Sequence, residues 1–182
     1  MSSTYRFVRE AFGDLPVKLH HLDMYLNFLD HVVEASNCLD MEAKISLDKI
    51  ELDANGLDIL DVQWVGDHNG SLGSPPRTPD HALQWDYLRE HNRLVVNLGR
   101  TVAPGTRFKV RTLTRCVPSD HILEGIYKDI TPPGAPQQYI SQCQQWGFQR
   151  IMPIFDDCRA KCTMTTTIEA DSAYTHLITN GI

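Results

Sequence analysis

The stretch His21-Leu22-Asp23-Met24-Tyr25-Leu26-Asn27-Phe28 alternates polar and apolar side chains with a period of two. Because neighbouring residues of a β-strand point to opposite faces, this period predicts a half-buried strand. A second alternating run sets the apolar Leu39, Met41, Ala43, Ile45 and Leu47 against the polar Asp40, Glu42, Lys44 and Ser46. We expect the two runs to pair through the connection at residues 30–37.

Short apolar runs continue along the chain and are bounded by turn dipeptides such as Asn55-Gly56 and Pro104-Gly105. They lie at residues 50–52, 57–60, 62–65, 94–98, 108–113 and 163–168. Many short strands with regular turns predict an all-β fold, mainly an antiparallel β-sandwich or saddle-like sheets with little helix. Only residues 7–12 and 79–89 have patterns compatible with a helix, and residues 69–79 and 131–138 are expected to form exposed loops.

Composition limits the class of protein. With 182 residues, 42% of them apolar, the chain can bury the core of one domain. A net charge of -6 and the lack of a Lys/Arg block argue against a nucleic-acid partner. No run approaches the length of a membrane span and the first residues lack a secretory pattern, so we expect no membrane partner. Five cysteines, an odd number, favour reduced thiols and a cytoplasmic location.

Three ordered motifs carry a resemblance to a known family. They are Ile50-Glu51-Leu52-Asp53-Ala54 followed by Leu57 and Ile59, then Leu123-Glu124-Gly125-Ile126-Tyr127, and finally Gln142-Cys143-Gln144 with Gly147, Phe148 and Arg150. In this order and spacing they resemble the N-terminal β-domain of the M1 (gluzincin) zinc aminopeptidases. The likeness runs from His20 to Ile182. Pro118-Ser119-Asp120 and the closing residues 177–181 make the chain most similar to the bacterial alanyl aminopeptidase (aminopeptidase N) branch.

The resemblance implies a domain division and a function. Residues 1–20 would be an extension that packs on the domain, and residues 21–182 would be the β-domain, truncated before a catalytic domain in the same polypeptide. The parent enzyme would release N-terminal amino acids from peptides with a catalytic zinc. This domain would cap the active-site cleft and bind the N-terminus of the peptide substrate.

By the same resemblance, Gln144 matches the position that holds the substrate α-amino group. An ammonium offers three donors, and an amide carbonyl supplies one acceptor. The aminopeptidase N branch usually carries Glu there, while leukotriene A4 hydrolase-like members carry Gln, and a neutral amide would bind an amine more weakly than a carboxylate. Strand alternation would place Gln142 on the face of Gln144 and Gln145 on the opposite face, as weaker substrate-binding candidates. A surface amide without a ligand is the structural alternative for Gln144.

Two further motif positions have structural explanations. Gly125 lacks a Cβ, which permits positive φ or a close backbone approach where a strand turns toward a site. A plain structural turn is the alternative. Tyr127 is expected to be a packed aromatic side chain with a satisfied hydroxyl. Arg150 is expected to pair with Asp156 or Asp157.

Catalytic and metal-binding patterns are missing from the sequence. Neither H-E-x-x-H nor G-x-M-E-N occurs, and His20-His21 would point to opposite faces of a strand. Cys158 and Cys162 have no second Cys/His pair to complete a zinc site, and there is no G-x-S-x-G. We therefore expect no catalytic residue, metal ligand or cofactor in this chain, with zinc in the parent enzyme. A stand-alone, non-catalytic β-sandwich for binding or scaffolding is the alternative function.

Overall fold

The computed structural model describes residues 13–67 and 80–180 of the chain. The strands are β1 (Val17–Phe28), β2 (Val33–Ala43), β3 (Leu47–Asp53), β4 (Asp58–Asp67), β5 (His81–Ala82), β6 (Gln84–Leu88), β7 (Arg93–Val102), β8 (Arg107–Cys116), β9 (Gly125–Lys128), β10 (Tyr139–Gln142) and β11 (Thr163–Ala170). Within the described residues, the helical segments are two short 3₁₀ turns, η2 (Arg89–His91) and η3 (Phe148–Arg150). The all-β prediction is confirmed.

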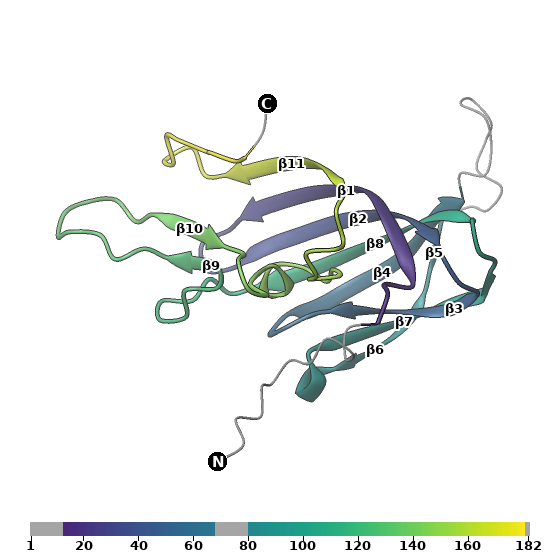
Figure 1. The fold of residues 1–182 in the computed structure, drawn as a ribbon. Coiled ribbons are helices and arrows are strands. Elements are labelled where there is room, and N and C mark those ends of the chain that lie inside the picture. The colour runs from purple at the N-terminus through teal and green to yellow at the C-terminus, as the bar shows by residue number, and fades with distance from the viewer. Residues whose placement is uncertain (1–12, 68–79, 181–182) are drawn as a thin grey trace, which may run out of the picture.

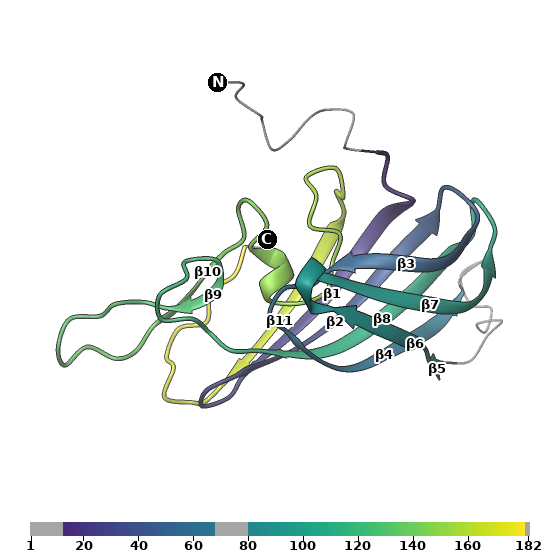
Figure 2. The same cartoon turned by 90° about the horizontal axis from the view of Figure 1, so that it is seen from below.

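Three sheets form the structure (Figure 1). A six-stranded sheet has the order β11-β1-β2-β8-β4-β5, a three-stranded sheet has the order β3-β7-β6, and β9 and β10 form a separate hairpin. All the strand pairs are antiparallel except β1 with β11, which run parallel. Figure 2 shows the three-stranded sheet lying across one end of the six-stranded sheet, while the β9–β10 hairpin extends beyond the other end.

The first two predicted strands exist and pair as expected, with Leu22 opposite Leu39. Their connection is shorter than predicted, because β2 begins at Val33 and Leu29 N–H donates to the Val32 carbonyl at 2.9 Å. The second alternating run is also broken. β2 ends at Ala43, Ile45 is 55% exposed in the following bend, and the chain enters the other sheet at Leu47.

The other predicted strands need two corrections. Residues 58–60 and 62–65 belong to one strand, β4, whose register with β8 shifts between Ile59 and Asp61, and Leu57 directly precedes it. The prediction of a helix at residues 79–89 is wrong, because β5, β6 and the start of η2 lie between residues 81 and 89. In β6 the half-buried Trp85 and Tyr87 alternate with exposed neighbours. This period of two is that of a strand. Residues 131–138 form the predicted loop, whereas residues 7–12 and 69–79 lie outside the described residues.

The core lies between the six-stranded and three-stranded sheets. Leu22, Leu39 and Met41 of one sheet and Ile50, Leu52, Leu94 and Val96 of the other are all at most 1% exposed. Trp64 and Phe108 stack with ring centroids 5.4 Å apart. No helix among the described residues is long and apolar enough to cross a membrane.

One non-strand segment, residues 148–157, is packed into this core, and we call it the inserted segment. Ile151, Met152, Ile154 and Phe155 are at most 6% exposed. The backbones of Asp53 and Ile154 exchange two hydrogen bonds, of 2.7 and 3.0 Å, which attach the inserted segment to β3.

A buried side chain attaches the inserted segment to the other sheet. Asn37 in β2 is 1% exposed, and its Nδ2 donates to the carbonyl of Pro153 at 2.6 Å. The Thr112 hydroxyl on β8 donates to Oδ1 of the same amide. Asn37 therefore connects strands β2 and β8 to the inserted segment. Its buried amide forms these hydrogen bonds directly with protein groups.

Replacing Asn37 with Ala should destabilise the protein by about 1 to 3 kcal/mol, because the Pro153 carbonyl and the Thr112 hydroxyl would remain buried without this partner. Urea denaturation measures the change. Ser36→Ala on the opposite face of β2 is the control and should change the free energy of unfolding by less than about 0.5 kcal/mol. Equal stabilities of the two variants would contradict this role for Asn37.

Candidate functional site

The candidate site lies at the end of the β9–β10 hairpin. Gly125 pairs with Gln142 and Tyr127 pairs with Ile140, so the motif at the start of β9 and the glutamine motif at the end of β10 are adjacent. Residues 143–147 then form a turn that leads into η3, closed by a 3.3 Å hydrogen bond from Gly147 N–H to the Cys143 carbonyl. We call residues 143–147 the glutamine turn. Two segments that are distant in the sequence thus form one local structure.

Two glycines make the close contact at the base of this turn. Gly125 has φ +70°, and a Cβ added there would lie 2.7 Å from Arg150 Cβ. A Cβ on Gly147 would lie 2.2 Å from the Gln142 carbonyl oxygen and 3.0 Å from Gly125 N. Gly125 thus has both a positive φ and a close approach to its neighbours, while its place in a functional site rather than in a plain structural turn stays a prediction. The sequence pattern did not predict this contact for Gly147, although the residue belongs to the third motif.

The glutamine turn has an unfavourable backbone. Gln145 has φ 57° and Trp146 has φ 72°, both in the left-handed region. For residues with a Cβ this conformation costs about 1 to 2 kcal/mol each. The surrounding contacts must offset that cost, so this conformation depends on the structure at both ends of the turn.

The three candidate glutamines are exposed, as a surface site requires. Nε2 of Gln142 lies 3.5 Å from Oε1 of Gln144, so these two amides are neighbours, although Gln144 itself lies beyond the end of β10. The argument that set Gln145 on the opposite face is wrong, because β10 ends at Gln142 and strand alternation does not continue into the turn. Whether any of these side chains binds substrate stays a prediction.

Arg150 does not have the predicted partner. Its Nε donates to Oε2 of Glu124 at 2.9 Å, across the hairpin. Asp156 instead accepts a 3.1 Å hydrogen bond from Gln149 N–H, and Asp157 pairs with Arg159. Asp156 and Asp157 were predicted because they are close to Arg150 in the sequence, but the β9–β10 pairing brings Glu124 closer in space.

Desolvation raises the pKa values of two groups at the glutamine turn, Asp156 and Cys143. Desolvation raises the pKa of Asp156 above its ordinary value, and nearby Asp53 raises it further. Desolvation, with a smaller contribution from Asp156, raises the pKa of the Cys143 thiol to about 11. Cys143 is exposed, yet its raised pKa favours the protonated thiol at neutral pH, which disfavours a role as nucleophile.

Tyr127 lies on β9 and is half-buried. Ser119 forms an isolated bridge with it, and Lys128 N–H donates to the Ser119 carbonyl at 2.7 Å. These backbone contacts fix the position of Tyr127, while the packing of its ring stays a prediction. The hydrogen-bond partner of its hydroxyl stays a prediction.

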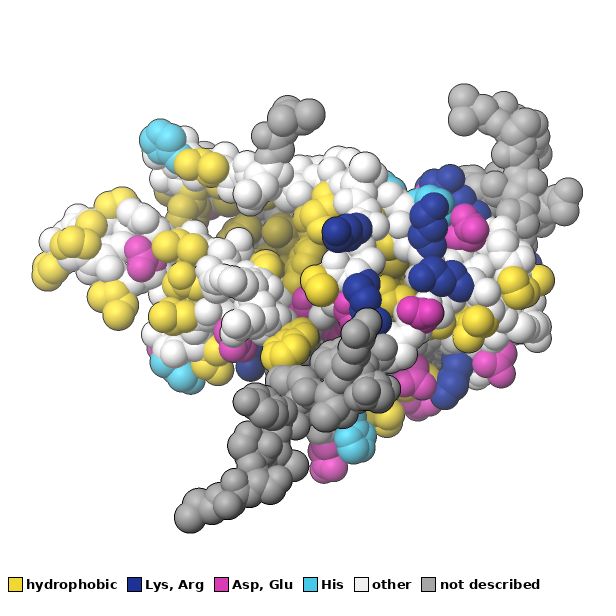
Figure 3. Space-filling view, in the orientation of Figure 1, with side chains coloured by type: hydrophobic (Ala, Val, Ile, Leu, Met, Phe, Trp, Pro, Cys, Tyr) yellow, Lys and Arg dark blue, Asp and Glu magenta, His cyan; other side chains and the backbone are white. Residues whose placement is uncertain are grey.

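Exposed apolar side chains gather around the same end of the molecule (Figure 3). Nine large hydrophobic residues that are at least 36% exposed lie in two stretches there, namely Val117, Ile122, Leu123, Ile130, Ile140, Trp146, Tyr174, Leu177 and Ile178. We call them the apolar end. A groove of about 470 Å³ opens among them, with Phe28, Tyr139 and Tyr174 in its wall. Much of the visible Lys and Arg lies over the other end of this face.

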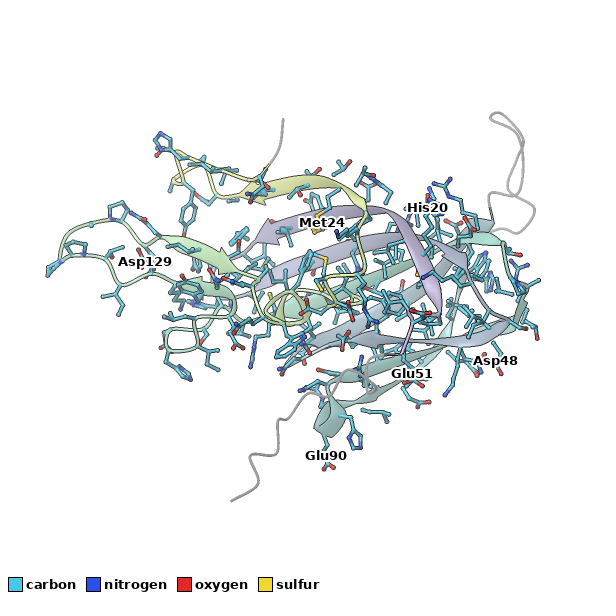
Figure 4. All side chains as sticks on the ribbon, viewed as in Figure 1. His20, Met24, Asp48, Glu51, Glu90 and Asp129 are labelled. Carbon is cyan, nitrogen blue, oxygen red and sulfur yellow. The ribbon has the colours of Figure 1, made fainter. Side chains whose placement is uncertain are left out.

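Metal-ligand geometry is not found among residues 13–67 and 80–180, where no three His, Cys, Asp or Glu side chains could share an ion. His20 contacts Glu42 at 2.9 Å, whereas His21 contacts Thr163 at 2.8 Å. The two histidines therefore contact different neighbours, Glu42 on β2 and Thr163 on β11. Figure 4 shows His20 on β1 and Asp129 on the hairpin at opposite ends of the structure. Cys158 and Cys162 are both free thiols.

The two sheets, the inserted segment and the projecting hairpin define an all-β domain that presents exposed amides within an apolar surface. The model of the Peptidase M1 N-terminal domain matches residues 17–181, and the chain belongs to this family. No curated protein gives a significant match. The family prediction is thus confirmed, while the bacterial branch and the division at residue 21 stay predictions.

Gly125→Ala should destabilise the domain by about 2 to 5 kcal/mol, because the left-handed φ and the overlap with Arg150 both oppose a methyl group. Gly134→Ala is the matched control, with φ +85° and no atom within 4 Å of the added Cβ, and should cost only about 1 to 2 kcal/mol. Thermal or urea unfolding compares them. Equal losses would show that the close contact at Gly125 is absent.

Alkylation of Cys143 should be slow at neutral pH and rise until about pH 11, because only the thiolate reacts. Mass spectrometry after timed iodoacetamide labelling gives the rate for this cysteine at each pH. A rate that levels off near pH 8 to 9, the range of an ordinary thiol, would contradict the desolvated environment.

Proposed function

We propose that this chain is the N-terminal domain of a zinc metallo-aminopeptidase that releases N-terminal amino acids from peptides. Membership of the Peptidase M1 N-terminal domain family supports a role as part of an M1 aminopeptidase. The domain caps the active-site cleft and helps bind the substrate α-amino group. The zinc and the residues that break the peptide bond belong to a catalytic domain of the same polypeptide.

The observation that carries this proposal is the exposed amide pair on the projecting hairpin. Oε1 of Gln144 is a neutral acceptor, and Gln142 lies next to it. A substrate ammonium needs several converging acceptors, and Gln144 Oε1, which accepts from Gln142 Nε2, supplies one of them through its second lone pair. Arg150 pairs with Glu124, so this neighbouring carboxylate already has a cationic partner. Recognition of the amine therefore rests on amide oxygens.

The apolar end supports docking on the catalytic domain. Large exposed hydrophobic side chains that gather on one face are typical of a surface that another protein covers. Two of these exposed residues are Ile140 on β10 and Trp146 in the glutamine turn itself, so a domain that covers them also covers the turn. An amine site between two domains would lie in a partly dehydrated place, where hydrogen bonds to a charged group are stronger than in water.

Within the complete enzyme, Gln144→Ala should raise KM for aminoacyl substrates about tenfold or more, because a hydrogen bond to a charged group contributes about 1.5 to 3 kcal/mol. Gln144→Glu should lower KM, since a charge-assisted hydrogen bond is roughly twice as strong. Steady-state kinetics with a chromogenic aminoacyl substrate measures both.

Gln138→Ala is the control for this test, because Gln138 is also an exposed amide but precedes β10 at the far end of the strand. It should leave KM unchanged. If Gln144→Ala behaves like Gln138→Ala, the amine-binding role is wrong. A polypeptide without peptidase activity and without a catalytic domain would favour the stand-alone binding module instead.

A further inference from the structure

Arg150 links the glutamine turn to the start of β9, two segments that are not adjacent in the sequence. It lies in η3, immediately after the glutamine turn, and its side chain is 28% exposed. Its partner Glu124 directly precedes Gly125, the first residue of β9. The 2.9 Å hydrogen bond from Arg150 Nε to Glu124 therefore connects the end of the glutamine turn to the start of the neighbouring strand.

Arg150 is itself held in place by the core. The carbonyl of Gln149 accepts a 2.8 Å hydrogen bond from Asn55 N–H, and Gln149 N–H donates to Asp156 at 3.1 Å. Ile151 and Met152, which follow, are at most 3% exposed. The guanidinium thus extends from a fixed support toward the more exposed hairpin.

The contacts continue from Glu124 to the candidate amides. Gly125 pairs with Gln142, whose side chain contacts that of Gln144 at 3.5 Å. The Gln142 carbonyl also packs against Gly147 at the other end of the turn. A displacement of the start of β9 would therefore move Gln142 and allow the strained turn at Gln145 and Trp146 to relax.

We propose that Arg150 is a positioning residue for substrate recognition: through Glu124 it holds the Gln142 and Gln144 amides in the arrangement that accepts the substrate ammonium. This assignment rests on the proposed amine-binding function of Gln144. The ion pair is partly exposed, and exposed ion pairs contribute little to global stability. Its main effect is on the local order of the turn.

The first test measures this order in the chain itself, independently of enzymatic activity. Nitrogen-15 relaxation compares the backbone of residues 143–147 and the side-chain amides of Gln142 and Gln144 in the wild type and in Arg150→Gln. The substitution should increase their mobility while the sheets remain unchanged. Arg115→Gln, which removes the similarly exposed pair of Arg115 with Glu34 on another part of the surface, is the matched control. Unchanged relaxation of the turn in Arg150→Gln would overturn the proposal.

The second test is a double-mutant cycle in the complete enzyme. Arg150→Gln should raise KM about threefold or more with kcat changed less than twofold, and it should add nothing in a Gln144→Ala background, because contacting residues of one network are not additive. The reversed pair Glu124→Arg with Arg150→Glu should restore part of the loss. An Arg150→Gln effect that persists undiminished without Gln144 would overturn the positioning role.

The two tests separate this inference from the proposed function. If Gln144→Ala leaves KM unchanged while Arg150→Gln still loosens the turn, the amine-binding function fails and the structural link from Arg150 to the turn stands. If Gln144→Ala raises KM while Arg150→Gln changes neither KM nor the relaxation of the turn, the positioning inference fails and the proposed function stands.

Discussion

The insertion of residues 148–157 between the two sheets is the constraint on which the rest of the structure depends. This segment has no regular strand hydrogen bonding of its own, yet it buries Ile151, Met152, Ile154 and Phe155 in the core. Its burial is tolerated because Asp53 and Asn37 satisfy backbone groups that would otherwise lack partners. The six-stranded and three-stranded sheets are thereby joined by a segment that belongs to neither.

This constraint gives the exposed site a rigid base. The glutamine turn emerges from the inserted segment, packs through Gly147 against Gly125, and contains two residues in the left-handed region. A strained and exposed turn keeps a single arrangement only if its ends are fixed. In the function proposed above the domain supplies recognition, since its contribution is a set of pre-positioned acceptors and the bond-breaking chemistry belongs to another domain.

The sequence predicted the fold class, the first strand pair and the family because these depend on local alternation and ordered motifs. It failed where tertiary contacts override local pattern. Ile45 continued an apolar alternation but lies in a bend, and residues 84–88 form a strand in which Trp85 and Tyr87 pack toward the core. At the site, the close approach at Gly125 could be predicted from its lack of a Cβ. The pairing of Arg150 with Glu124 could not, since it depends on the hairpin register across 26 residues of sequence.

The left-handed residues Gln145 and Trp146 had no sequence signal either, because neither is a residue type that favours this conformation. The strand alternation predicted for Gln142 to Gln145 stops at Gln142, where β10 ends and the Gln142 carbonyl packs against Gly147.

The measurement that tests the central claim most directly is a crystal structure of the complete polypeptide with a bound amino acid. We predict that Gln144 Oε1 lies within about 3.2 Å of the ligand's α-amino nitrogen, the distance of a hydrogen bond. A glutamine turn that faces solvent, away from a ligand in the catalytic domain, would contradict the account.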